Sequence, residues 1–273
     1  MNKQNLSLKQ TLSCGQAFRW NCIDEINETW TGIASNRTLT VSQNNLEVIE
    51  KNPFWSHYFD LEQDYESIRK ELSKISPIMK KACQYSPGIR ILNQDPWEIL
   101  ISFILSQYNN ISRIKQMVNN LCKLTNPETL LFPTPKQILE INPEELQTLK
   151  FGFRDKYVLD GAMKINSGEI NLEEIQNMKI EDAEKELMKI KGIGKKVSSC
   201  ILLFGFHRLE SFPVDVWIKR AMDNWFDGKA GDQVFGSFAG IAQQYLFNYI
   251  RNLKDSTTTE HKRLDKNNID AIS

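Results

Sequence analysis

The chain has 273 residues, and its 34 lysines and arginines balance 34 aspartates and glutamates, so its formal net charge is zero at pH 7. Hydrophobic residues make up 41% of the sequence and charged residues 25%. These values are typical of globular proteins and exclude a disordered chain, a collagen-like chain and a strongly basic tail protein. The neutral balance argues against a partner held by overall charge, although it is compatible with a local basic surface.

The five cysteines are scattered, and none forms a CxxC pair or a four-cysteine cluster with zinc or iron–sulfur spacing. We therefore expect reduced, buried thiols in a cytosolic protein without a metal centre. The first residues lack the continuous apolar region of a secretory signal, so secretion is not expected. The longest apolar run, near residues 99–105, is far shorter than a membrane span.

Residues 1 to about 60 contain short β-branched and aromatic runs separated by polar clusters. This pattern predicts the hairpins of an antiparallel sheet. The residues of these runs are Phe18, Trp20, Trp30, Thr31, Ile33, Thr38, Thr40, Val41, Val48 and Ile49.

From about residue 61 the apolar spacing becomes helical, and Asp95-Pro96 supplies a good N-cap and first position for an apolar helix through about Gln107. Further helices are predicted near residues 110–124, 135–140, 143–150, 154–165, 171–176, 181–189, 196–206, 216–226 and 233–253. The predicted fold class is α+β, with a β-rich antiparallel N-terminal domain over 1–85 and a mostly helical body over 86–254. The polar tail over 255–273 is expected to be disordered.

A glycine-rich segment over residues 190–197 separates two predicted helices. Gly192 and Gly194 allow positive φ angles and a close approach of a ligand to the backbone. The start of the following helix offers free N–H groups to a phosphate. A tight helix–helix turn without a ligand explains the glycines equally well. Between Glu186 and Glu210 there are no acids, and the basic residues are Lys189, Lys191, Lys195, Lys196 and Arg208.

About twenty residues after this segment comes Pro213-Val214-Asp215-Val216. The combination resembles the helix-hairpin-helix, Gly/Pro…Asp superfamily of DNA base-excision glycosylases. Further segments resemble 8-oxoguanine DNA glycosylases: GQAFRW at 15–20, QDP at 94–96, the run over 106–113, GFRDKY at 152–157 and AGIAQQYLF at 239–247. The resemblance covers about 230 residues and implies a β-rich domain followed by helical domains that contain the helix-hairpin-helix.

The resemblance implies a bifunctional enzyme in which Lys196 attacks C1′ of the damaged nucleotide and Asp215 is the second catalytic residue. A lysine amine is protonated at pH 7 in water and must lose its proton to attack. Burial, the adjacent Lys195 and a helix N-terminus all favour the neutral form. Asp215 is also predicted to cap the helix that follows it. No cofactor is implied, because the lysine supplies the nucleophile.

The resemblance also implies a binding site for the extruded base. The carbonyl of Gly15 would accept a hydrogen bond from N7–H, which 8-oxoguanine has and guanine lacks. Cys200 and Phe247 would sandwich the base, and Gln243 would bind its Watson–Crick edge. Without the resemblance, the cysteine and the phenylalanine are better explained as core residues, and the glutamine as a surface residue.

DNA contacts follow from the same matches. Phe153 would be the wedge that enters the gap left in the duplex by the extruded nucleotide. Arg113 and Arg154 would read the cytosine that loses its pairing partner. The remaining DNA-binding residues implied are Asn109, Asn110, Gly192, Gly194, Lys195 and Trp217. Tyr108 departs from the family, because it stands where relatives have an asparagine that contacts the opposite cytosine, and Trp217 replaces a histidine.

The implied partner is double-stranded DNA containing 8-oxoguanine, and we expect a monomer that does not associate with membranes. The expected location is the nucleoid-containing cytoplasm if the source is bacterial and the nucleus if it is eukaryotic. Two alternatives stay open: a related glycosylase/lyase for another lesion or for abasic sites, and a DNA-binding module without catalysis.

Overall fold

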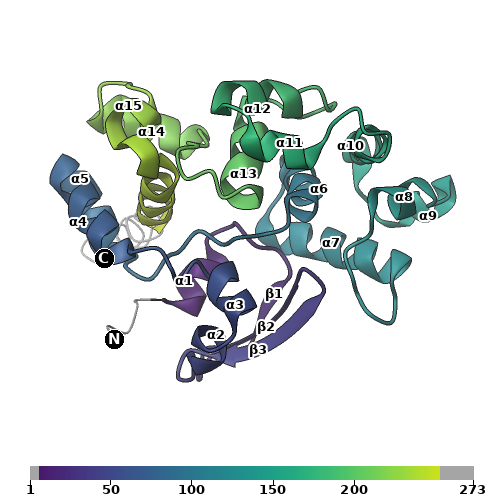
Figure 1. Cartoon of the computed structure of the whole chain (residues 1–273), viewed down its shortest axis with the longest axis horizontal. Coiled ribbons are helices and arrows are strands. Elements are labelled where there is room, and N and C mark those ends of the chain that lie inside the picture. The colour runs from purple at the N-terminus through teal and green to yellow at the C-terminus, as the bar shows by residue number, and fades with distance from the viewer. Residues whose placement is uncertain (1–5, 253–273) are drawn as a thin grey trace, which may run out of the picture.

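The computed structural model describes residues 6–252, so the tail expected from residue 255 lies outside the described residues. The N-terminal region contains an antiparallel sheet with the strand order β1-β2-β3 (Figure 1). Its strands are β1 (Trp20–Asp24), β2 (Thr29–Ala34) and β3 (Arg37–Ser42). The predicted sheet of hairpins is therefore confirmed.

Alternating burial along β2 directs one face of the sheet into a small core. Three short helices pack against this face: α1 (Leu8–Ser13), α2 (Glu47–Glu50) and α3 (Pro53–Tyr58). Trp20 is 1% exposed at the centre of this core, and its indole N–H donates to the Tyr58 hydroxyl at 2.8 Å. The ring covers Gly32, where a Cβ atom would lie 2.3 Å from it.

The prediction was wrong for Val48 and Ile49, which lie in the helix α2 rather than in a strand. Ile49 is fully buried in the small core, while Val48 is exposed. A run of only two β-branched residues fits either element, because periodicity does not separate a strand from a helix over so short a length. Asn52 and Pro53 then end this turn and start α3, where the Asn52 side chain accepts from the amide of Phe54 at 3.0 Å.

The rest of the described chain is helical, as predicted. The helices are α4 (Tyr65–Ile75), α5 (Pro77–Tyr85), α6 (Pro96–Ser106), α7 (Ile111–Thr125), α8 (Pro135–Leu139), α9 (Pro143–Thr148), η1 (Gly152–Arg154), α10 (Asp155–Asn166), α11 (Leu172–Asn177), α12 (Ile180–Leu187), α13 (Lys195–Gly205), α14 (Val216–Trp225), α15 (Gly231–Phe235) and η2 (Gly236–Phe238). A last helix begins at residue 239 and continues through residue 252. The predicted helical region from 233 is thus divided into α15, the 3-10 helix η2 and the last helix.

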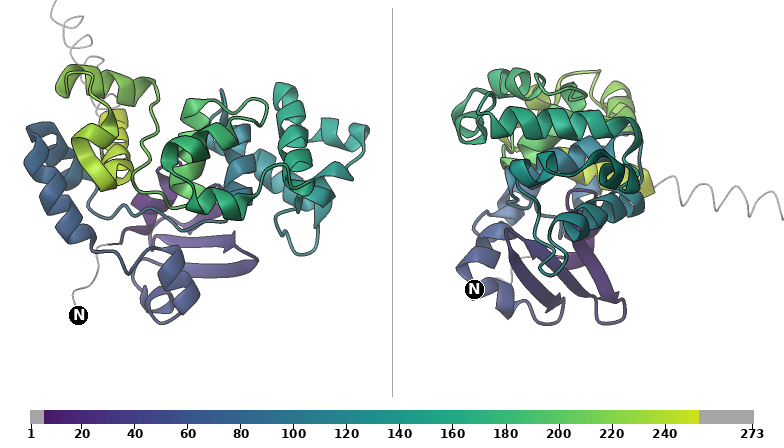
Figure 2. Two further views of the ribbon diagram at one scale, coloured as in Figure 1. Left: turned by 45° about the horizontal axis from the view of Figure 1, so that its top comes forward. Right: turned by 90° about the vertical axis from the view of Figure 1, so that its right-hand side faces the viewer.

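Helix α6 lies in the middle of the helical body, where it packs against α7, α10 and α13 (Figures 1 and 2). Residues 99–105 are buried on every side, as their apolar sequence predicts. Helices α4 and α5 belong to this larger core and not to the small core under the sheet. The domain boundary near residue 85 stays a prediction. Within residues 6–252, no helix combines the length and apolar character needed to cross a bilayer.

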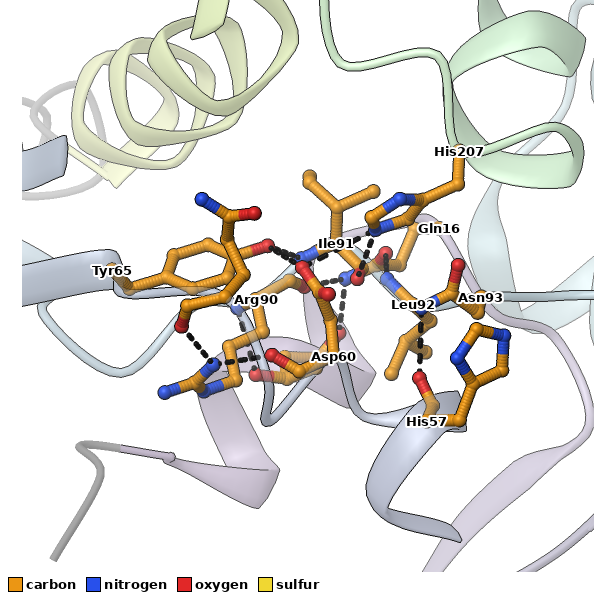
Figure 3. Close-up of polar contacts among 11 residues, drawn as sticks. Gln16, His57, Asp60, Tyr65, Arg90, Ile91, Leu92, Asn93 and His207 are labelled. Carbon is orange, nitrogen blue, oxygen red and sulfur yellow. Dashed lines mark hydrogen bonds and ion pairs between the residues drawn. The ribbon is translucent and has the colours of Figure 1, made fainter. Parts of the chain in front are cut away.

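A buried polar cluster joins the N-terminal region to the helical body (Figure 3). Nε2 of His207, which follows α13, lies 3.2 Å from Oδ2 of Asp60, which follows α3. The Tyr65 hydroxyl donates to the same oxygen at 2.8 Å and accepts from the amide of Ile91 at 2.8 Å. Because buried polar groups are costly when unpaired, this cluster fixes how the two regions are oriented.

Candidate active site

A pocket of about 400 Å³ opens between the N-terminal region and the helical body. Its walls come from residues 14–18, from α6 and the start of α7, from α13, from the start of α14 and from the last helix. The predicted site residues that line it are Gly15, Asn109, Asn110, Lys196, Cys200, Asp215, Trp217, Gln243 and Phe247. The structure therefore brings together residues more than two hundred positions apart in the sequence.

Lys196 lies in the first turn of α13, whose N-cap is Gly194. No side chain caps this helix, so its first amides remain available to a ligand. The ammonium group lies 5.7 Å from the ring centre of Phe103 on α6, within cation–π range. The expected burial of Lys196 is not found, because the side chain reaches into an open pocket and the residue is exposed.

Asp215 caps α14, as predicted from its position. Its Oδ1 atom accepts hydrogen bonds from the amides of Trp217 at 3.0 Å and Ile218 at 2.8 Å. These two bonds fix the carboxylate at the pocket wall. Among the described residues, no ion pair joins Asp215 to Lys196. The two charged groups therefore line one pocket without being in direct contact.

Cys200 and Gln243 are both nearly inaccessible to solvent but contribute to the pocket wall. Burial raises the pKa of the Cys200 thiol, and the ammonium group of Lys196, one helical turn away, acts in the opposite direction. The Oε1 atom of Gln243 is buried without a hydrogen-bond partner in the part of the chain described. A buried acceptor of this kind favours a ligand that donates a hydrogen bond in the pocket.

The five cysteines are free thiols, and all but Cys22 are buried. The prediction of burial is thus confirmed for the other four and wrong for Cys22, which lies on an exposed position of β1. No group of three His, Cys, Asp or Glu side chains within residues 6–252 is arranged to hold a metal ion.

Gly15 has a φ of +90°, a backbone conformation that side chains rarely adopt. The next residue, Gln16, is fully buried and holds this turn in place (Figure 3). Its Nε2 atom donates to the carbonyls of Arg90 at 2.7 Å and Thr11 at 3.0 Å, and its Oε1 atom accepts from the amide of Leu92 at 2.9 Å. Gln16 is therefore a positioning residue for Gly15, and the sequence reasoning had not identified it.

The glycine-rich segment forms the turn between α12 and α13, anchored on α10. Gly192 has a φ of +81°, and a Cβ atom there would lie 2.3 Å from the ring of Tyr157. The buried carboxylate of Asp160 accepts from the amide of Lys191 at 2.8 Å and pairs with its Nζ atom at 3.4 Å. Around Gly194 there is open space, because a Cβ atom at this position would meet nothing within 4 Å. This side of the turn is free for a ligand.

The positive charge near the turn is smaller than the sequence suggests. Lys189 pairs with Glu186 at 2.7 Å, Lys191 pairs with Asp160, and Arg208 pairs with Glu210 at 2.6 Å. Lys195 and Lys196 have no ion pair among the described residues. The positive field is therefore concentrated at the start of α13.

Besides Gly192, Gly194 and Lys195 at the start of α13, three predicted DNA-contacting residues lie outside the pocket. Phe153 is half exposed at the turn before α10, and Arg113 is exposed on α7. Arg154 is only 5% exposed, and its guanidinium group donates to backbone carbonyls. The accepting carbonyls belong to Phe151, Gln107 and Tyr108. Burial, with the nearby Arg113 as a smaller cause, lowers the pKa of Arg154.

Asn109 and Asn110 are used by the protein itself. The Asn109 side chain donates to the carbonyl of Leu105 at 3.1 Å, and the Asn110 side chain caps α7 by accepting from the amide of Arg113 at 2.9 Å. Their side chains therefore shape the loop that borders the pocket.

The sequence reasoning missed several pocket residues. Phe103 lies beneath Lys196, and Gln244 and Arg251 contribute to the wall formed by the last helix. The spacing from Gln243 through Phe247 to Arg251, at i, i+4 and i+8, places all three along one helical face. That spacing was a signal for Arg251, whereas Phe103 sits in a helix that is apolar on every side and carries no such signal.

Comparison with known proteins identifies related DNA repair proteins. Residues 1–100 match the family model of the 8-oxoguanine DNA glycosylase N-terminal domain, and residues 101–234 match that of the HhH-GPD superfamily base excision DNA repair proteins. The N-glycosylase/DNA lyase of Saccharomyces cerevisiae is 32% identical over 81% of this chain and 68% of its own length.

Solved structures show the same fold. The 8-oxoguanine glycosylase/lyase of Clostridium acetobutylicum, in complex with double-stranded DNA that has cytosine opposite 8-oxoguanine, has a TM-score of 0.81 and 35% identity, covering 92% of this chain and 93% of that one. A structure of MBOgg1 with a low-affinity DNA ligand has a TM-score of 0.81 and 36% identity, covering 93% and 94% of the two chains. The chain therefore belongs to the 8-oxoguanine DNA glycosylase/lyase family of the helix-hairpin-helix, Gly/Pro…Asp superfamily.

Proposed function

We propose that this bifunctional glycosylase/lyase removes 8-oxoguanine from duplex DNA and cuts the strand at the same site, with Lys196 as the nucleophile. The observation that carries the proposal is the pocket that Lys196 and Asp215 both line without pairing, and whose wall also includes Gly15. The complex of the Clostridium acetobutylicum relative with 8-oxoguanine DNA supports the choice of substrate.

The base of an intact duplex is not accessible, so the damaged nucleotide must be extruded into the pocket. The neutral amine of Lys196 then attacks C1′, and the N-glycosidic bond breaks as its electron pair leaves with the base, which takes up a proton. The amine nitrogen loses a proton and the sugar ring opens to form an imine between Lys196 and C1′. Loss of a proton from C2′ expels the 3′ phosphate and cuts the strand.

Asp215 stabilises the positive charge that develops on the sugar as the base leaves. A carboxylate held by two amide hydrogen bonds needs little rearrangement when that charge appears. Because Asp215 does not pair with Lys196 in the free protein, its charge is not already neutralised by the nucleophile.

Lys196 must lose its proton before it attacks, and the free protein leaves it exposed. We propose that the extruded nucleotide supplies the missing burial by covering the pocket and excluding water. The adjacent charge of Lys195 and the uncapped start of α13 then favour the neutral amine. The nucleophile is thus activated by binding of the substrate.

The base is recognised by a backbone carbonyl, by a side-chain amide and by two side chains that pack against its faces. The Gly15 carbonyl accepts from N7–H of 8-oxoguanine and repels the N7 lone pair of guanine. The unpartnered Oε1 atom of Gln243 accepts from the Watson–Crick edge, which carries the N–H donors of a guanine-type base. Cys200 and Phe247 enclose the base between them.

The duplex is held around the pocket. Gly192, Gly194 and Lys195 bind backbone phosphate at the start of α13, where helix amides are uncapped. Phe153 enters the gap left by the extruded nucleotide, and Arg113 and Trp217 contact the DNA beside it. The enzyme acts where the genome is, in the nucleoid or the nucleus.

Borohydride trapping tests the nucleophile. The wild-type protein mixed with 8-oxoguanine duplex and borohydride is expected to form a covalent protein–DNA adduct, and Lys196→Met is expected to form none. Lys195→Met is the matched control, because it removes the neighbouring lysine from the same helical turn and should slow the formation of the adduct without abolishing it. An adduct with Lys196→Met, or its loss only with Lys195→Met, contradicts the assignment.

Asp215→Asn tests the second catalytic residue. The amide oxygen still caps α14, so the unfolding temperature should change little. Single-turnover excision should fall by about 10²–10³-fold, the range found when one preorganised electrostatic group is removed. A panel of duplexes with other lesions and with abasic sites shows whether 8-oxoguanine is the preferred substrate.

A further inference from the structure

Tyr108, in the loop between α6 and α7, presents an aromatic ring to solvent in a strained backbone conformation. It is 95% exposed, and its φ of +49° is uncommon for a residue other than glycine. Strain of this kind persists only where the surrounding structure holds it, and it is concentrated at functional sites. The strain and exposure together point to a role for the ring in contacting another molecule rather than in stabilising the fold.

The surrounding structure does hold this loop. The guanidinium group of Arg154 donates to the carbonyl of Gln107 at 2.9 Å and to that of Tyr108 at 3.3 Å. The same group lies 4.4 Å from the ring centre of Phe153. One buried cation therefore connects the Tyr108 loop to the turn that carries Phe153.

Tyr108 and Phe153 form one exposed aromatic surface, here called the two-ring platform. Their ring centres are 6.3 Å apart and the planes are 69° from parallel, and Phe153 is 46% exposed. Tyr157 packs against Phe153 edge to face, with ring centres 5.9 Å apart. The platform is thus built before any ligand arrives, which reduces the entropy lost on binding.

We propose that Tyr108 is a specificity-determining residue that stacks on the base left unpaired opposite the extruded nucleotide, and so accepts any of the four bases there. The proposal rests on the proposed function, in which Phe153 enters the gap in the duplex. Every base has an aromatic face, so stacking on a ring stabilises an unpaired base with little preference for its identity.

The hydrogen-bonding groups near the platform support tolerance over selectivity. Arg154, which the family resemblance pointed to as a reader of the opposite cytosine, is buried and already donates to backbone carbonyls. Tyr108 offers a single hydroxyl in place of an amide that has two N–H donors and a separate carbonyl acceptor. Arg113 is the remaining exposed cation of this surface that the resemblance assigned to the cytosine.

Single-turnover excision of 8-oxoguanine tests the proposal with five substrates: each of the four bases opposite the lesion, and an abasic analogue opposite it. Tyr108→Leu keeps an apolar side chain but removes the ring. It is expected to slow excision by about 5- to 150-fold for all four bases, the loss that stacking on one base implies. Opposite the abasic analogue, where no base is available to stack, Tyr108→Leu should match the wild type.

Tyr108→Phe keeps the ring and should restore wild-type rates with every opposite base. Tyr108→Asn should recover a preference for cytosine, since it exchanges stacking for hydrogen bonding. Equal rates for Tyr108→Leu and the wild type with all bases, or the same loss opposite the abasic analogue, overturn this proposal and leave the proposed function standing. If the wild type excises no 8-oxoguanine from any duplex, the proposed function and this inference fail together.

Discussion

Gly192 and Gly194 differ by two positions in the sequence, but the structure gives them separate tasks. Gly192 has a φ of +81° and packs against the ring of Tyr157, whereas Gly194 has a φ of −104° with open space around it. We therefore expect Gly192→Ala to disturb the fold of the turn and Gly194→Ala to leave the fold intact. The pair forms an internal comparison, since both variants add one methyl group.

The expected cost of Gly192→Ala has two parts. A side chain in the left-handed region costs about 1–2 kcal/mol. The new Cβ atom would lie 2.3–2.5 Å from three carbon atoms of the Tyr157 ring, and overpacking of this kind costs about 1–3 kcal/mol. The free energy of unfolding should therefore fall by about 2–5 kcal/mol, against less than about 1 kcal/mol for Gly194→Ala.

Urea unfolding measures the loss of stability that we expect for Gly192→Ala. Binding to undamaged duplex measures the loss of DNA affinity that we expect for Gly194→Ala. Gly194→Ala should unfold like the wild type but bind DNA less tightly, because its methyl group meets only the incoming phosphate. The double variant Gly192→Ala/Tyr157→Leu should regain the packing part of the loss and keep the backbone part. Equal stability of the two single variants, or no recovery in the double variant, would refute this division of roles.

Three further predictions concern buried polar groups. Gln16→Leu leaves the Arg90 carbonyl and the Leu92 amide unpaired, at about 1–3 kcal/mol each, while the Thr11 carbonyl keeps its bond from the Cys14 thiol. The variant should lower stability and reduce discrimination of 8-oxoguanine from guanine at Gly15, while cleavage of abasic sites in single-turnover assays is retained. Burial raises the pKa of Glu98 from 4.5 to about 7 despite its arginine partner. The stabilisation of the fold by the protonated Glu98 side chain is therefore complete below pH 4.5 and is lost as the pH rises through about 7. Glu98→Gln should flatten the pH dependence of urea unfolding. Asp160→Ala should weaken binding to undamaged duplex by freeing the Lys191 amide, whereas Asp160→Asn, which still accepts from that amide, should retain most of it in fluorescence anisotropy.

Local signals in the sequence were sufficient for most of the fold. Asp95-Pro96 and Asp215 are predicted caps, and both cap helices in the structure. The buried strand residues Trp30 and Val41 alternate with less buried neighbours, which identifies a sheet with one buried face. These features depend on neighbours within a few positions, and that is why they could be predicted.

The site was harder to predict, because its properties depend on contacts between distant segments. The resemblance indicated which residues meet, but neither it nor the residue pattern showed that Lys196 is exposed or that Arg154 donates to the loop before α7. Gln16 belongs to the GQAFRW motif, but its role in holding the Gly15 turn depends on hydrogen bonds to residues 90–92, which are distant in the sequence. Burial and hydrogen-bond partners are set by tertiary structure, so a single sequence leaves them open.

The wall contributed by the last helix has a consequence for biosynthesis. Lys196 and Asp215 leave the ribosome before Gln243 and Phe247, and the pocket stays open on one side until the final helix has docked. If the proposed function holds, a nascent chain that carries Lys196 but not the last helix therefore lacks one wall of the pocket for the base. The wall that these residues supply is therefore complete only once the polypeptide has been translated through this helix.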